Sequence, residues 1–306
     1  MIKKFKNTVR TRMGNAVQPM VEAMVKQRLL PMDSRILDNS FITGKLLPYN
    51  TASADYVVKV EKDQRASSTR LPVPPIEYWE GYADTEEDYL AGGKKDMDVL
   101  LSILEKAEAS PKTFTRVLDL GCAAGRMLRH FPGTKGKSEL WGSDINARYI
   151  NWCQQNFDDP FFFLTNTTAP HLPFEDNSFD LVYCGSVFTH ITDTADAWFL
   201  ELRRILRKGG YAYLTIHDEH TLDLMFTKYK DDPLFSDFVE SVRQFYEKQS
   251  VQGQNYVYFN ICSDPASQIF YNREYLVKKW ARFARVLSVT PEAHDHQTAI
   301  LLQKPL

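Results

Sequence analysis

Between residues 116 and 216 the chain alternates short apolar runs with longer amphipathic segments, and this pattern constrains the fold more than any other feature. Short apolar runs indicate buried strands, whereas apolar residues spaced three and four apart indicate the packed face of a helix. Repeated strand–helix–strand units imply a mostly parallel sheet with helices on both faces. The expected strands are 116–120, 140–144, 161–164, 179–184 and 211–216. The expected helices are 95–108, a helix from a glycine turn towards residue 130, 147–156 and 194–207.

Glycine pairs mark two of the expected helix boundaries. Gly92 and Gly93 precede the helix at 95–108. Gly209 and Gly210 follow the helix at 194–207, and they would end it because glycine readily adopts the left-handed conformation found after many helices. The next strand would then begin directly after the second pair.

The alternation is interrupted at residues 218–270, which are polar, aromatic and long for a connection. We expect this segment to form an insertion on the substrate side. A helix at 272–282 and strands near 284–290 and 297–303 would then complete the sheet. The expected fold is α/β and Rossmann-like, with a seven-stranded, mostly parallel sheet whose last strand runs antiparallel. Residues 1–93 would form an N-terminal extension and a helical or extended cap.

The composition excludes several classes of protein. Hydrophobic residues make up 43% and charged residues 25% of the chain, which is ordinary for a soluble globular protein. The formal net charge of -2 creates no overall field that would attract nucleic acid or an anionic membrane. The apolar stretches are much shorter than a membrane-spanning helix requires. Four cysteines without metal-ligand spacing indicate reduced thiols in a cytoplasmic protein without a metal site.

One expected turn carries the residues of a ligand site. The segment from Val117 to Arg126 ends a strand and opens the next helix. Gly121 permits a tight turn in which the backbone approaches a ligand, and Gly125 permits close packing after the turn. Asp119 places a carboxylate at the strand end, where a cationic amino group could be bound. The ligand would therefore lie at the carboxyl edge of the sheet.

A second acidic residue indicates a ribose. Asp144 ends the next expected strand, where a carboxylate can accept hydrogen bonds from both hydroxyl groups of a ribose. A dinucleotide is the rival ligand, but its G-x-G-x-x-G pattern is absent because Ala123 lies between Gly121 and Gly125. The charge of Asp119 would also repel a pyrophosphate. The residues therefore favour a nucleoside that carries a cationic group.

These residues resemble the class I methyltransferases, whose first motif reads approximately D-x-G-x-G-x-G. Here the motif runs from Asp119 to Gly125, with alanine in place of the middle glycine. The similarity continues over residues 94–217 and implies a methyltransferase domain at 94–306. Further matching segments are Leu172–Val182, Ser186–Ile191 and Glu201–Gly210, with weaker similarity to bacterial small-molecule members at Phe270-Tyr271, Tyr275-Leu276 and Gln297.

The resemblance implies S-adenosylmethionine as the cofactor and S-adenosylhomocysteine as its product. Asp119 would lie near the amino group of the methionine portion, and Arg126 would either pair with its carboxylate or remain a solvated helix residue. Asp144 would hold the ribose, with Ile145 packed on the adenine. The adenine edge would contact Asn166 or Thr167. Further contacts to the methionine portion would come from Gly121, Cys122, Ala123, Gly125, Cys184 and Gly185.

The methyl acceptor determines whether a base is needed. An oxygen nucleophile usually needs one, whereas an amine only has to arrive unprotonated. The candidate bases follow the fourth and fifth strands, and they are His190, His217 and Asp218. Each also has a structural interpretation, and the choice among them stays open. Four tyrosines could cover a sulfonium as a lid or belong to the core, namely Tyr78, Tyr82, Tyr89 and Tyr271.

We expect a methyltransferase that acts on an oxygen or nitrogen atom of a small molecule such as a natural product, a sugar or an amine. No basic patch is interleaved with aromatic residues, as nucleic-acid binding would require. The aromatic-rich cap and insertion instead favour an enclosed pocket. The alternatives are a non-catalytic interaction module with the same fold and an NAD(P)-dependent oxidoreductase. The sequence leaves the oligomeric state open.

Overall fold

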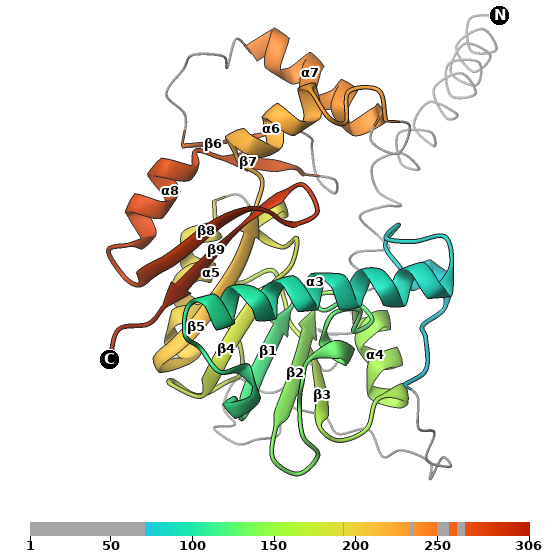
Figure 1. Cartoon of the computed structure of the whole chain (residues 1–306), viewed down its shortest axis with the longest axis vertical. Helices are drawn as coiled ribbons and strands as arrows, with labels where there is room; N and C mark the ends of the chain where they lie inside the picture. Colours follow the sequence, from blue (N-terminus) through green and yellow to red (C-terminus); the bar gives the residue numbers. More distant parts are fainter. Residues whose placement is uncertain (1–70, 192, 233–235, 250–256, 262–266) are drawn as a thin grey trace, which may run out of the picture. The chain divides into compact units, whose positions relative to one another are not determined.

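The structure is a computed structural model that describes residues 71–306, apart from 192, 233–235, 250–256 and 262–266. Its main element is a seven-stranded sheet in the order β3-β2-β1-β4-β5-β9-β8 (Figure 1). Strands β1 to β5 are parallel, and β9 is antiparallel to both of its neighbours. The strands are β1 Arg116–Leu120, β2 Glu139–Asp144, β3 Phe161–Thr165, β4 Phe179–Cys184, β5 Leu206–Ile216, β8 Arg285–His294 and β9 Gln297–Gln303. The predicted Rossmann-like α/β fold is therefore confirmed, including the antiparallel last strand.

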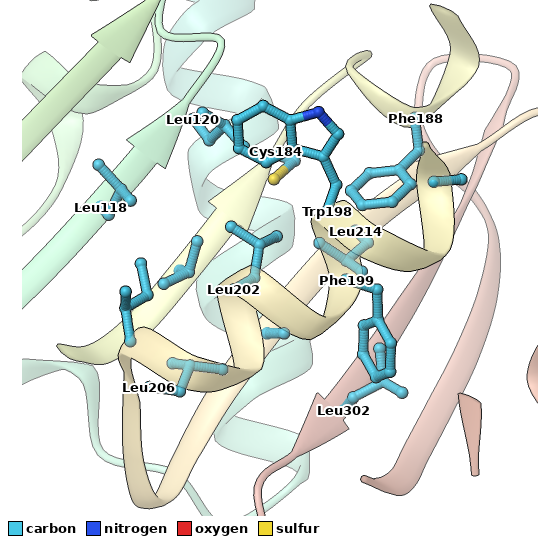
Figure 2. Close-up of a cluster of buried hydrophobic side chains, with 14 of the residues drawn as sticks. Leu118, Leu120, Cys184, Phe188, Trp198, Phe199, Leu202, Leu206, Leu214 and Leu302 are labelled. Carbon is cyan, nitrogen blue, oxygen red and sulfur yellow. The ribbon is translucent and has the colours of Figure 1, made fainter. Parts of the chain in front are cut away.

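Helices cover both faces of the sheet and create two cores. Successive strand residues point to opposite faces, so Val117 belongs to one core and Leu118 to the other. The helices α3 Glu86–Lys106 and α4 Ala147–Asn156 cover the Val117 face, and α5 Ala195–Ile205 and α8 Arg273–Trp280 cover the opposite face. Figure 2 shows Trp198, Leu202 and other side chains of α5 packed against the strands on the second face. No helix among the described residues is long and apolar enough to span a membrane.

The segment between β5 and α8 contains residues 218–270, for which we predicted an insertion. It contains helices α6 Glu219–Phe226 and α7 Ser236–Gln249, and a two-stranded antiparallel sheet of β6 Tyr258–Asn260 and β7 Ile269–Tyr271. Aromatic and aliphatic side chains from these elements, including Phe259 and Phe270, form a small core of their own. The role of this segment on the substrate side stays a prediction. So does the division into residues 1–93 and 94–306, because residues 1–70 lie outside the described part of the chain.

Helix α3 begins nine residues earlier than the predicted helix at 95–108. The Thr85 hydroxyl caps it by accepting a hydrogen bond from the backbone N–H of Asp88 at 3.1 Å. Gly92 and Gly93 therefore lie inside the helix, and their interpretation as a boundary was wrong. A Cβ atom on Gly93 would lie 2.4 Å from the carbonyl oxygen of Arg126. Glycine allows the helix to approach the segment after β1 at this point.

The predicted helix from the glycine turn towards residue 130 is also absent. The described backbone between β1 and β2 contains turns and one short 3-10 helix, Leu128–His130. Ala123 and Gly125 have φ angles of 45° and 76°, which an α-helix does not accommodate. The left-handed residues therefore prevent an α-helix from starting at the glycine turn.

The second glycine pair lies within β5 and does not end a helix. Helix α5 ends at Ile205, and β5 begins at Leu206. The pairing of β5 with β4 shifts register between Phe179 and Leu181, where β5 contains extra residues. A Cβ atom on Gly210 would lie 2.9–3.1 Å from three carbonyl oxygens, so glycine is required by this bulge.

The close approach of α3 predicts opposite effects for its two adjacent glycines. Gly93→Ala should destabilise the protein by about 1–3 kcal/mol, because the new methyl group overlaps the Arg126 backbone. Gly92→Ala should be neutral or stabilise the protein by up to about 1 kcal/mol, since the new methyl group would make an ordinary van der Waals contact of 3.6 Å with the Arg126 side chain. Urea unfolding of both variants measures the difference. Equal stabilities would contradict the packing described here.

Candidate functional site

The glycine loop after β1 is fixed to the end of β2. The backbone N–H groups of Gly121 and Cys122 both donate to the carbonyl oxygen of Ser143, at 2.7 and 3.1 Å. The Asp144 carboxylate accepts hydrogen bonds from the N–H groups of Ala123 at 2.9 Å and Asn146 at 2.8 Å. The loop and the second acidic residue are therefore one connected unit at the carboxyl edge of the sheet.

Two glycines in this loop have no room for a side chain. Gly121 has a φ of 80°, and a Cβ atom there would lie 2.3 Å from Cγ2 of Val187. Gly125 has a φ of 76°, and its Cβ atom would lie 2.9 Å from the ring of Phe157. Both positions combine left-handed backbone with a close contact, which only glycine tolerates without strain. Ala123 has a φ of 45°, so the alanine in place of the motif's middle glycine adopts a backbone that favours glycine.

The protonation states of the Asp119 and Asp144 carboxyl groups can change when a charged ligand binds beside them. Burial raises the pKa of Asp119 to about 7; the nearby Tyr183 hydroxyl opposes this shift, and the charge of Asp144 adds to it. Burial also raises the pKa of Asp144 to about 6, against the hydrogen bonds from Asn146 and Ala123. A cationic ligand group beside Asp119 would favour its ionised form. The pair therefore suits a ligand with a positive charge and hydrogen-bond donors.

Arg126 is not a solvated helix residue, and its pairing with the cofactor carboxylate stays a prediction. Its side chain is buried, and its guanidinium donates to the Asp96 carboxylate of α3 at 2.5 Å. The guanidinium also lies 4.0 Å from the centre of the Tyr82 ring. The interpretation of Arg126 as a solvated residue was wrong, because α3 extends far enough to cover it.

A cleft lies between this loop and the residues that precede and begin α3. Three of the four tyrosines considered for a lid line it, whereas Tyr271 is buried in the core and donates from its hydroxyl to the carbonyl oxygen of Ile191. The cleft is lined by Tyr78, Trp79, Tyr82, Tyr89, Asp119, Gly121, Cys122, Ala123, Arg126, Met127, Gly185 and His294. His294 and the Asp96 partner of Arg126 were missed from the sequence, because no local pattern marks either of them.

The residues proposed for the adenosine portion are differently placed. Ile145 is 43% exposed directly after Asp144, so it presents an apolar surface beside the expected ribose position. Asn166 is buried; its Oδ1 accepts from the Ser143 hydroxyl at 2.6 Å, and its Nδ2 donates to the carbonyl oxygen of Thr167 at 2.8 Å. The Thr167 hydroxyl accepts from the N–H of Ala169. Both polar side chains therefore already have partners within the protein.

The end of β4 brings its backbone to the cleft. Cys184 is fully buried, and burial raises the pKa of its thiol, so its side chain is inert. Gly185 lines the cleft beside Met127 and His294, and a Cβ atom there would lie 3.3 Å from Sδ of Met127. The described cysteines Cys122, Cys153 and Cys184 are buried free thiols, and Cys262 lies outside the described residues.

None of the three candidate bases lines the cleft. His217 is buried, neither of its ring nitrogens has a hydrogen-bond partner, and burial keeps the pKa of its imidazole well below the usual value. Its ring packs against Phe270 at 5.0 Å and His296 at 5.2 Å. Within the described residues, no group of three or more histidine, cysteine or acidic side chains could hold a metal ion.

The other two candidate bases have structural partners. His190 is exposed, and its Nδ1 lies 2.7 Å from the carbonyl oxygen of Ser267. Asp218 is fully buried and caps α6, because its Oδ1 accepts from the N–H groups of His220 and Thr221. Its Oδ2 accepts from Arg273 at 3.2 Å. These contacts favour structural roles for both residues over the role of a base.

Comparison with known proteins agrees with the loop geometry. The profile of a family described as "Methyltransferase domain" matches residues 118–214, from the middle of β1 to β5. The matched segment contains the whole glycine loop and both acidic residues. It ends before the insertion and before His294.

Several relatives are methyltransferases. A probable phthiotriol/phenolphthiotriol dimycocerosates methyltransferase of Mycobacterium ulcerans is 34% identical over 33% of this chain and 39% of its own length. A fatty-acid O-methyltransferase of Mycolicibacterium smegmatis is 31% identical over 33% of this chain and 36% of its own length. A ubiquinone/menaquinone biosynthesis C-methyltransferase of Cupriavidus pinatubonensis is 28% identical over 42% of this chain and 52% of its own length.

The alignments thus span only about a third to a half of each of these relatives. Together with the strand order and the paired carboxylates, these matches identify residues 118–214 as part of a class I S-adenosylmethionine-dependent methyltransferase domain.

Proposed function

We propose that this protein transfers a methyl group from S-adenosylmethionine to an oxygen or nitrogen atom of a small molecule. The observation that supports this best is the pair of carboxylates, buried Asp119 and half-buried Asp144, on either side of a glycine loop at the carboxyl ends of adjacent strands. A ligand with a cationic amino group and a ribose meets both carboxylates at once. Bound there, S-adenosylmethionine supplies a methyl group that is activated by the positive charge on sulfur.

The residues around the loop fit this cofactor. Asp119 would face its amino group, and Asp144 has further lone pairs for the ribose hydroxyls beyond the two N–H groups it already binds. The exposed side chain of Ile145 would cover one face of the adenine. Gly185 would bring backbone, without a side chain, to the methionine portion.

The small-molecule acceptor is supported by the aromatic lining of the cleft. Tyr78, Trp79, Tyr82 and Tyr89 line it together with the glycine loop, which suits an enclosed ligand. The relatives include an O-methyltransferase and a C-methyltransferase by name, so they do not select the acceptor atom. We therefore propose an oxygen or nitrogen acceptor without support from these relatives.

Removing the second carboxylate should abolish most of the cofactor affinity. Asp144→Ala should weaken S-adenosylhomocysteine binding by about 10- to 100-fold, since it removes hydrogen bonds to a charged acceptor. Isothermal titration calorimetry measures the affinity, with NADH as a comparison ligand. Wild-type protein that binds NADH but not S-adenosylhomocysteine would overturn the proposed function.

A matched control is available in Asp180, a buried aspartate at the amino end of β4. It accepts hydrogen bonds from the N–H groups of Thr115 and Arg116 and is also paired with Arg207. Asp180→Asn should lower the thermal stability but change the affinity for S-adenosylhomocysteine by less than about threefold. Equal losses of affinity in both variants would mean that Asp144 acts through general stability.

Cofactor affinity should fall as the pH is lowered through 7. Asp119 has a pKa of about 7, so it is mostly protonated at pH 6 and cannot balance the charge of the ligand's amino group. We expect affinity for S-adenosylhomocysteine to be up to about tenfold weaker at pH 6 than at pH 8. Asp119→Asn should weaken binding at pH 8 and flatten this dependence. A wild-type affinity that is the same at both pH values would exclude this role for Asp119.

A further inference from the structure

We propose that His294, oriented by Asp96, is the base that accepts the proton of a hydroxyl group when that hydroxyl is methylated. This inference rests on the proposed function and names the chemistry of its acceptor. Neither residue belongs to the segment that matches the methyltransferase family.

The end of β8 is irregular in a way that redirects His294. The pairing of β8 with β9 shifts register between Thr290 and His294, where β8 contains extra residues. Glu292 and Asp295 on either side of this position have φ angles of 51° and 53°, which are uncommon for residues other than glycine. Bulges of this kind commonly re-aim a side chain near an active site, and strained residues gather at such sites.

The redirected side chain lies in the cofactor cleft. His294 is 3% exposed and lines the cleft together with Gly185 and the glycine loop. A Cβ atom on Gly185 would lie 3.3 Å from Cε1 and 3.5 Å from Nε2 of His294. Because the proposed methionine portion lies against Gly185, Nε2 lies on the side of the cleft where methyl transfer would occur.

The other ring nitrogen faces a carboxylate. Nδ1 of His294 is buried and lies 3.6 Å from Oδ2 of Asp96, with no hydrogen bond in the present geometry. A shift of a few tenths of an ångström would convert this contact into a hydrogen bond, and such contacts often tighten when substrate binds. A proton on Nδ1, directed at Asp96, leaves the lone pair of Nε2 free to face the cleft. Arg126 holds the same Asp96 oxygen and so fixes its position.

Burial keeps the His294 imidazole in the unprotonated form that a base requires. Burial lowers the pKa of His294 to about 4; Asp96 and Asp295 act against this shift, and Arg126 and His296 add to it. The imidazole is therefore unprotonated at neutral pH. After the transfer it would return the proton readily to water.

The proton balance favours a hydroxyl acceptor. When the acceptor oxygen forms its bond to the methyl carbon, the carbon–sulfur electron pair stays on sulfur and the positive charge passes to the oxygen. The O–H bond then breaks, its electrons remain on oxygen, and the proton moves to Nε2. An ether results, and the charge ends on an imidazolium beside Asp96. An amine that arrives unprotonated needs no such base, so an oriented base in the cleft points to oxygen.

The decisive measurement is the position of the proton on His294. Nitrogen-15 NMR of histidine-labelled protein at pH 7 distinguishes the two neutral tautomers, and His294→Gln assigns the signals. We expect a neutral ring with the proton on Nδ1, and movement of the Nε2 and Cε1–H signals when S-adenosylhomocysteine is added. The exposed His171 serves as a control that should not move. A proton on Nε2, or unmoved His294 signals, would overturn the proposal.

Calorimetry on the same sample tests the base assignment of His294 separately from the proposed methyltransferase function. Failure of S-adenosylhomocysteine to bind would refute the proposed function itself, whereas binding without any response of His294 refutes only the base assignment. A panel of phenols, alcohols and primary amines then tests the acceptor. Methylation of amines alone by the wild-type protein would exclude the hydroxyl.

Turnover of a hydroxyl acceptor adds a kinetic test. His294→Gln should lower kcat by about 100-fold or more while KM for S-adenosylmethionine changes by less than about threefold. His171→Gln should match the wild-type protein. Added imidazole should partly restore a His294→Ala variant, which a structural role would not predict. A His294→Gln variant with wild-type kcat would contradict the proposal.

Discussion

The site depends on the hydrogen bond between the Asp144 carboxylate and the backbone N–H of Ala123. This contact connects the end of β2 to the loop after β1, and the Ser143 carbonyl reinforces it by accepting from two further loop N–H groups. Adjacent parallel strands end at the same edge of the sheet, so the fold brings the partners together without a special connection. One carboxylate thereby shapes the loop and remains available to a ligand.

Helix α3 extends this arrangement to the other side of the cleft. Gly93 allows the helix to touch the backbone at Arg126, and Asp96, one turn further along, pairs with the Arg126 side chain. The same carboxylate faces His294 at the end of β8. The loop that would hold the cofactor and the base that would serve the acceptor therefore share one anchoring residue. A change in the position of α3 would affect both.

The sequence predicted those features that depend on local pattern. The bounds of β1, β4 and α4 agree with the predicted ranges, and Asp119 and Asp144 lie at the expected strand ends. Both glycine pairs were misinterpreted, because close approach to a distant backbone has no local signature. His294 was missed for a similar reason: only the bulge and the register of β8 bring it to the cleft. His217 and Asp218 follow β5 as expected, but both are buried: His217 packs against Phe270, and Asp218 accepts a hydrogen bond from Arg273 of α8.

The central claim is that the cofactor binds against the glycine loop and the end of β2. Hydrogen–deuterium exchange with and without S-adenosylhomocysteine tests this claim most directly, because it reports on each backbone segment. The account predicts slower exchange in peptides that contain residues 121–126 and 144–146, and unchanged exchange in β6 at residues 258–260. Saturating ligand that leaves the glycine loop unprotected, or protects only the insertion, would contradict it.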